Sequence, residues 1–192
     1  MKTTILKLVI VSLLLAMQSC SPMTKMILKI SGEYKNPQIE DSLSVLTYCK
    51  EKQVNYDQLW MIKSKENYKV LAKDGGLGVP DVLIFNNKKN PVTNEIQTEC
   101  SWALAGIVYD TNAIIIETGD STLFYKIMDN FVLVDDRTLI DSPDFYIIGK
   151  WAKFLPKLSH SLFETINEQK ASSNIKVKHI LLNVDYQKDW YD

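Results

Sequence analysis

Several residue types are scarce in this chain, and each scarcity excludes a class of protein. Seven glycines and six prolines among 192 residues are too few for a linker-rich or low-complexity protein. Two histidines and three cysteines, with no CxxC pair, give no basis for a Cys/His metal cluster, so we predict no metal site and no cofactor. The 22 basic and 23 acidic side chains nearly cancel, which argues against a nucleic-acid partner.

The N-terminal twenty residues are typical of an export signal. Lys2 and Lys7 precede Leu8 to Met17, a mostly apolar stretch that is too short to span a membrane, which takes about 20 residues. Ser19-Cys20 follows and resembles the lipobox of bacterial lipoproteins, in the looser form found in Bacteroides-type bacteria. The resemblance implies cleavage after residue 19, lipidation of Cys20 and a membrane anchor in the cell envelope. An ordinary signal peptide that ends near the same place is the alternative.

The remaining cysteines, Cys49 and Cys100, form an even pair in a compartment that permits disulfides. A bridge between them would close a loop of about 50 residues and contribute on the order of 4 kcal/mol to stability. Two separate buried thiols are the alternative. Sequence separation alone does not decide between them, because a disulfide needs Cα atoms within about 7 Å.

Short apolar runs alternate with helical patterns along the chain, which predicts an α/β fold. We expect strands at 59–62, 82–85, 113–116, 131–134, 145–148 and 177–184, the run at 113–116 being buried. Helices are expected at 39–53, 65–73, 100–108, 123–128 and from Pro156 onward, with Ser64 as the cap of the second. A polar turn at 86–90 predicts a hairpin, and residues 26–30 could form a first strand or continue a tether.

The C-terminal part of the chain predicts a βαβ unit. After the strand at 145–148, Leu158, Leu162 and Ile166 recur at every fourth position on one helix face, and a second strand follows. Strands joined in this way are parallel when they share a sheet.

Two stretches resemble thioredoxin. The first, GVPDVLIFNNKKN from Gly78 to Asn90, is similar to the segment in which a cis-proline precedes a strand and a polar hairpin follows. The second, from Asp144 to Asp185, contains DFYIIGKWAKFLPKL and IKVKHILLNVD and is similar to the first βαβ unit of that family. The resemblance implies one thioredoxin-like domain, with a central mixed sheet flanked by helices.

The resemblance also argues against redox catalysis. Leu155 and Leu158 stand where the two catalytic cysteines of the family would be. A disulfide oxidoreductase needs a thiolate at the start of this helix and a second thiol to resolve the mixed disulfide. We therefore assign no catalytic residue.

The order of the two stretches differs from that of the family, because Pro80 comes before Trp151. A permuted strand order, with the C-terminal βαβ unit supplying the first two strands, is the interpretation we favour. The alternative is the ordinary order over the first part of the chain, with residues 144–185 as an added half-domain.

In thioredoxin-like proteins the edge beside the cis-proline pairs with an extended peptide, a mode of recognition that needs no cysteine. Carried over to this chain, the resemblance implies a cis Pro80; a trans turn is the alternative that base rates favour. The peptide-binding edge would comprise Val79, Pro80, Trp151, Phe154, Leu155 and Leu158.

The sequence thus predicts a signal peptide at 1–19, a lipidated Cys20 with tether and potential first strand at 20–38, and a thioredoxin-like domain at 39–192. The expected function is binding of an extended peptide or a partner protein. The alternatives are a thiol-disulfide oxidoreductase that uses Cys49 and Cys100, and a surface binding or immunity lipoprotein without thiol chemistry.

Overall fold

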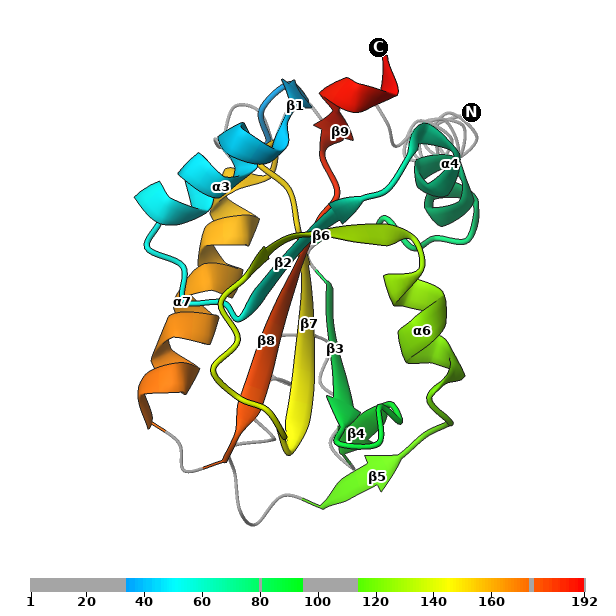
Figure 1. Ribbon diagram of the computed structural model, residues 1–192, viewed down its shortest axis with the longest axis vertical. Helices are drawn as coiled ribbons and strands as arrows, with labels where there is room; N and C mark the ends of the chain where they lie inside the picture. The colour runs from blue at the N-terminus through cyan, green and yellow to red at the C-terminus, as the bar shows by residue number, and fades with distance from the viewer. Residues whose placement is uncertain (1–33, 80, 95–113, 173–174, 192) are drawn as a thin grey trace, which may run out of the picture.

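The computed structural model describes residues 34–79, 81–94, 114–172 and 175–191 (Figure 1). This part of the chain is an α/β fold with a five-stranded mixed sheet flanked by helices, which confirms the predicted fold class. The leader, Cys20, the potential strand at 26–30 and the helix expected at 100–108 lie outside the described residues.

Helices and strands are interspersed along the described chain. The strands are β1 (Ile39–Glu40), β2 (Gln58–Ile62), β3 (Asp81–Asn86), β4 (Val92–Asn94), β5 (Ile115–Glu117), β6 (Phe131–Asp136), β7 (Phe145–Trp151), β8 (Val177–Asn183) and β9 (Tyr186–Gln187). The helices are α3 (Ser42–Glu51), α4 (Lys65–Lys73), α6 (Thr122–Met128) and α7 (Pro156–Ser172), followed by the short 3-10 helix η1 (Lys188–Trp190).

The central sheet has the order β3-β7-β8-β2-β6. β7 and β8 are parallel neighbours joined by α7, so the predicted βαβ unit is confirmed. β2 is parallel to β8, whereas the outer strands β3 and β6 run antiparallel to their neighbours. Two-stranded pairs lie at the opposite ends of the fold, β1 with β9 and β4 with β5 (Figure 1).

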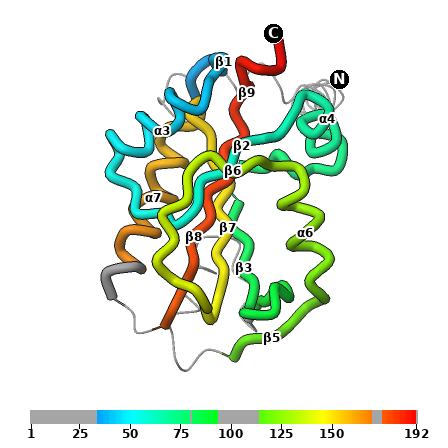
Figure 2. The backbone as a smooth tube through the Cα atoms, viewed as in Figure 1, coloured from blue at the N-terminus to red at the C-terminus, as the bar shows by residue number. Residues whose placement is uncertain are grey.

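The helices cover both faces of the central sheet: α3 and α7 lie on one side, and α4 and α6 on the other (Figures 1 and 2). Val45 of α3 and Leu162 of α7 belong to one apolar cluster, and Leu71 of α4 and Phe124 of α6 to another. Gly149 in β7 lets α7 approach closely, since a Cβ there would lie 3.0 Å from Leu162 Cδ2.

Local signals account for the helix boundaries. Asp41 and Ser44 form a capping box at the start of α3, in which each side chain accepts a hydrogen bond from the other's backbone N–H. Ser64 caps α4 by accepting from the Asn67 N–H, and the helix has the predicted bounds. Gly75, with φ of 72°, follows α4 in the left-handed conformation that glycine adopts without strain.

Two expectations differ from the structure. The first helix begins at Ser42, because Ile39 and Glu40 form β1 instead. The strand expected at 113–116 is β5, at Ile115–Glu117, and its residues are exposed, since its only partner among the described residues is β4, away from the central sheet. The hairpin expected at 86–90 is present as a tight turn closed by an antiparallel bridge between Phe85 and Pro91, after which β4 pairs with β5.

Candidate functional site

Trp151, at the end of β7, cannot contribute to a peptide-binding edge. Its side chain is fully buried, and its ring stacks on Tyr48 at a centroid distance of 5.7 Å and meets Phe163 edge-on at 5.0 Å. The prediction was wrong for this side chain because β7 extends three residues beyond the expected Ile148 and carries Trp151 into the core.

The other predicted edge residues lie near one another. Phe154, Leu155 and Leu158, in the loop after β7 and the first turn of α7, are half-buried, as is Val79. Phe154 and Val79 pack against the same apolar cluster. The register of β3 on β7 pairs Asp81 with Lys150, so the chain that enters β3 arrives beside the end of β7. Pro80 lies outside the described residues, and its predicted cis bond stays a prediction.

The chain itself already covers part of this loop. The backbone N–H of Lys35 donates to the carbonyl of Phe154 at 2.8 Å, and the ring of Tyr34 lies edge-on to that of Phe154 at 6.0 Å. An extended peptide binds through free backbone groups, so this loop has fewer groups for a peptide to pair with than the family resemblance implies.

Cys49 lies on the inner face of α3 and is a free, fully buried thiol. Burial raises its pKa to about 12, so the thiol is protonated at neutral pH and has no access to a disulfide partner in solution. The free thiol of Cys49 favours the alternative of two separate thiols over a bridge, and Cys100 lies outside the described residues.

A buried polar cluster lies at the carboxyl ends of β7 and β8. Lys153 Nζ forms an ion pair with Glu40 Oε2 at 2.5 Å, and its backbone N–H donates to both carboxylate oxygens of Asp185, at 3.1 and 2.9 Å. Asn183 Nδ2 donates to Asp185 Oδ2 at 2.7 Å, and Gln187 Nε2 donates to the Asp185 carbonyl at 2.8 Å. These bonds hold β1, the loop after β7 and the turn after β8 together.

Burial raises the pKa of Asp185, although the hydrogen bonds from Lys153 and Asn183 oppose that shift. The pKa of Tyr48, which stacks beside this cluster, is also raised, mainly by burial. Since Lys153 is neutralised by Glu40 and Asp185 accepts hydrogen bonds from its neighbours, the cluster is suited to holding three segments in place.

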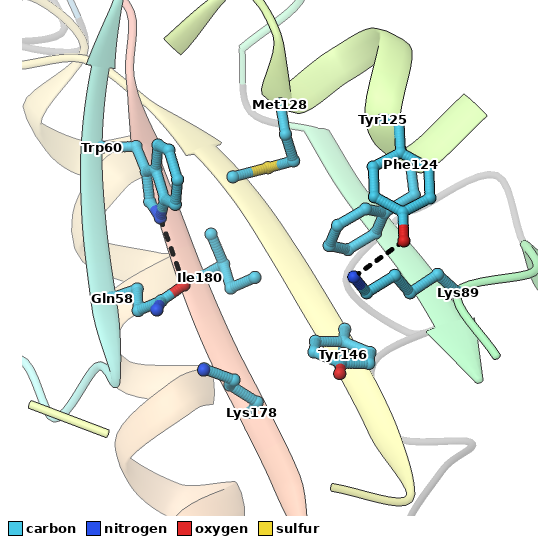
Figure 3. A pocket seen from close by; sticks show the side chains of 9 residues that line it. All are labelled: Gln58, Trp60, Lys89, Phe124, Tyr125, Met128, Tyr146, Lys178 and Ile180. Atoms are coloured by element: carbon cyan, nitrogen blue, oxygen red, sulfur yellow. Dashed lines mark hydrogen bonds between the residues drawn. The ribbon is translucent and has the colours of Figure 1, made fainter. Parts of the chain in front are cut away.

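A hollow of about 350 Å³ opens on the other face of the sheet, between α6 and strands β2, β7 and β8 (Figure 3). Its walls are largely apolar and aromatic, with two lysines on opposite sides. The lining residues are Gln58, Trp60, Lys89, Phe124, Tyr125, Met128, Tyr146, Lys178 and Ile180.

The edge strand β6 pairs only with β2 within the described residues. Its first four residues, Phe131 to Val134, include no charge and no proline, and Val132 and Leu133 are 46% and 41% exposed. Proteins commonly protect open edges with charged residues or prolines. Because this segment has neither, it is an available hydrogen-bonding edge.

The sequence interpretation missed the polar cluster and the hollow. Asp185 carried a signal, since polar residues that follow parallel strands gather at one edge of an α/β sheet. No sequence pattern indicated the hollow, because its walls come from five separate segments of the chain. In the described ranges, no group of three or more His, Cys, Asp or Glu side chains is arranged to hold a metal ion.

Comparison of the chain with protein-family models, with curated proteins and with solved structures found no match.

Proposed function

We propose that this chain is a lipid-anchored protein of the bacterial cell envelope, and that its α/β domain binds an extended peptide or a partner protein without thiol chemistry. The binding part of this proposal rests on the exposed apolar edge of β6. The proposed lipid anchor rests on the sequence of residues 1–20. In the part of the chain that the structure describes, no helix is long and apolar enough to cross a bilayer.

The resemblance to thioredoxin is supported by the strand order. In a permuted sheet of that kind, β7 and β8 would be the first two strands of the family and β3 the strand after the proline. The parallel β7-β8 pair with β3 antiparallel beside β7 is compatible with this assignment.

A thiol-disulfide oxidoreductase is the less favoured function. Leu155 and Leu158 supply no thiol at the start of α7. Cys49 is buried, and its raised pKa removes the thiolate that would attack a disulfide.

Strand addition at β6 is the binding mode we favour. An extended peptide that pairs with a free strand edge gains main-chain hydrogen bonds, and its alternate side chains contact the neighbouring surface. Leu133 lies opposite Trp60 in the β2-β6 register, so a peptide on this edge would extend an apolar row that begins inside the fold.

The binding mode is tested with peptides selected from a random library on the chain from Ser21 onward, which includes every described residue. We expect peptides that shift the NMR signals of the β6 amides and that lose binding to the Leu133→Lys variant. Leu123→Lys is the matched control, because Leu123 on α6 is 42% exposed, close to the 41% of Leu133. Selected peptides that bind Leu133→Lys unchanged, or that shift other amides only, would refute strand addition at β6.

The anchor is tested by metabolic labelling of the full chain with an alkyne-bearing palmitate in a bacterial host. The label and membrane association should be lost in Cys20→Ser and retained in Cys49→Ala. Labelled, membrane-bound Cys20→Ser protein would exclude Cys20 as the lipidated residue.

A further inference from the structure

The hollow beside α6 has the composition of a small-molecule site (Figure 3). Ligand pockets are typically apolar clefts of roughly 300 to 1,000 Å³ with a few polar groups, and this one, at about 350 Å³, is at the small end. We propose that it binds a small amphipathic anion, with a flat apolar or aromatic body and one carboxylate, sulfonate or phosphate group. No residue of β6 lines this site, so it differs from the peptide-binding edge proposed above.

The body of the ligand is assigned from the walls. The rings of Trp60, Tyr146 and Tyr125 and the side chains of Met128 and Ile180 line the hollow. Aromatic rings offer large contact area and favour flat partners, through stacked or edge-on contacts. Phe124 is itself packed edge-on against Tyr146, at a centroid distance of 5.4 Å, which holds this wall in place.

The negative charge is assigned from the two half-buried lysines. Lys89 Nζ donates to the Tyr125 hydroxyl at 3.0 Å and lies over the rings of Phe124 and Tyr125. Lys178 is paired with Tyr146 in the β7-β8 register and enters the hollow from the sheet. Neither ammonium group lies within ion-pair distance of a carboxylate of the described residues, so each can pair with the charged group of an anion.

The side chains of Trp60 and Gln58 already have hydrogen-bond partners. Trp60 Nε1 donates to Gln58 Oε1 at 3.3 Å, and Gln58 Nε2 donates to Asp136 Oδ2 at 2.9 Å. Lys178 also interacts with Asp136, since that lysine adds to the lowering of the Asp136 pKa, after the larger contributions of Thr138 and Gln58. Because Asp136 offsets part of the Lys178 charge, Lys89 should make the stronger contact with the anion.

The test uses two dyes with nearly the same aromatic body, anilinonaphthalene sulfonate, which is an anion, and phenylnaphthylamine, which is neutral. We expect saturable binding of the sulfonate to the chain from Ser21 onward. Lys89→Met should weaken binding of the sulfonate roughly tenfold, because the loss of a hydrogen bond to a charged group raises the dissociation constant by about that factor. Lys178→Met should weaken it less, since Asp136 offsets part of the Lys178 charge. Binding of the neutral dye should be almost unchanged in both variants.

Two further variants locate the dye. Lys69→Met removes an exposed lysine of α4 and should leave both dyes unaffected, and Trp60→Phe should reduce energy transfer from tryptophan to the bound dye. Circular dichroism and urea midpoints of the variants identify any that misfold. The proposal is overturned if the sulfonate does not bind saturably, if correctly folded Lys89→Met and Lys178→Met bind it as the parent does, or if Lys69→Met weakens it equally.

Discussion

The two faces of the central sheet differ in how completely they are filled. On the α3/α7 face, Trp151, Cys49 and Leu181 are fully buried and the helices cover the sheet closely. On the α4/α6 face, Trp60, Tyr146 and Met128 are only half-buried, and the hollow opens among them. Because close packing leaves no room for a ligand, the hollow between helix and sheet described above lies on the α4/α6 face.

Chemical access to Cys49 should show the largest contrast. On the chain from Ser21 with Cys100→Ser, we expect a thiol reagent to modify Cys49 at least about a thousandfold more slowly in the folded state than in urea. Folded domains open rarely, and burial also keeps the thiol protonated by raising its pKa to about 12. Ellman's reagent measures both rates. Rapid modification without urea would mean that the α3/α7 face opens easily, and it would revive the thiol-based function.

Ring deletions compare the packing of the two faces directly. Trp151→Ala should lower the free energy of unfolding by about 3 to 5 kcal/mol, because it leaves a cavity among Tyr48, Phe163 and their neighbours. Tyr146→Ala should cost about 1 to 2 kcal/mol, since that ring already borders open space. Urea denaturation measures both values. Equal losses would contradict the difference between the faces.

Removal of a helix cap should lower the free energy of unfolding by a similar amount on the two faces. Asp41→Ala at α3 and Ser64→Ala at α4 each remove a side chain that accepts a backbone N–H, and each should cost about 1 kcal/mol. The same denaturation experiment applies, with Thr47→Ala on the outer face of α3 as a control that should change little. A loss at Asp41 several times that at Ser64 would show that closer packing around α3 amplifies cap defects.

The smallest expected effect is the pH dependence of stability that arises from two aspartates, Asp136 and Asp185. Burial raises the pKa of Asp185 above its ordinary 3.8, whereas hydrogen bonds from Thr138 and Gln58 lower that of Asp136 to about 2. Asp136 therefore contributes stability above pH 3.8 that is lost as the pH falls through about 2. Asp185 has the opposite sign, because its favourable contribution is present below 3.8 and is lost as the pH rises to its folded pKa.

NMR titration of the side-chain carboxyl carbons should place Asp136 below 3.8 and Asp185 above it. The Asp185→Asn and Asp136→Asn variants assign the two signals. The reverse order would mean that the hydrogen bonds around Asp185 outweigh its burial.

Local signals were sufficient where an element depends on its own residues. Ser64 and Gly75 delimit α4, and Pro156 begins α7, because caps and breakers act over a few residues. The parallel β7-β8 pair was predictable as well, since a single helix joins the two strands.

Contacts between distant residues could not be predicted. Ile39 and Glu40 were assigned to a helix, but they pair with Tyr186 and Gln187, and nothing near Glu40 indicates a partner so far along the chain. The family resemblance places Trp151 at a peptide-binding edge, but Tyr48 and Phe163 enclose its ring. The strand β5 has the apolar residues of a core strand, although its only partner in the described chain lies outside the central sheet.

The parallel pair of β1 and β9 has a mechanical consequence. If the chain is held by a lipid at Cys20, a pull on the domain passes through Lys35 before it reaches β1. The Lys35 N–H is bonded to the Phe154 carbonyl, β1 is paired with β9, and Glu40 of β1 forms an ion pair with Lys153. The tethered end of the domain is thus fastened at three successive points before the force reaches α3 and the central sheet.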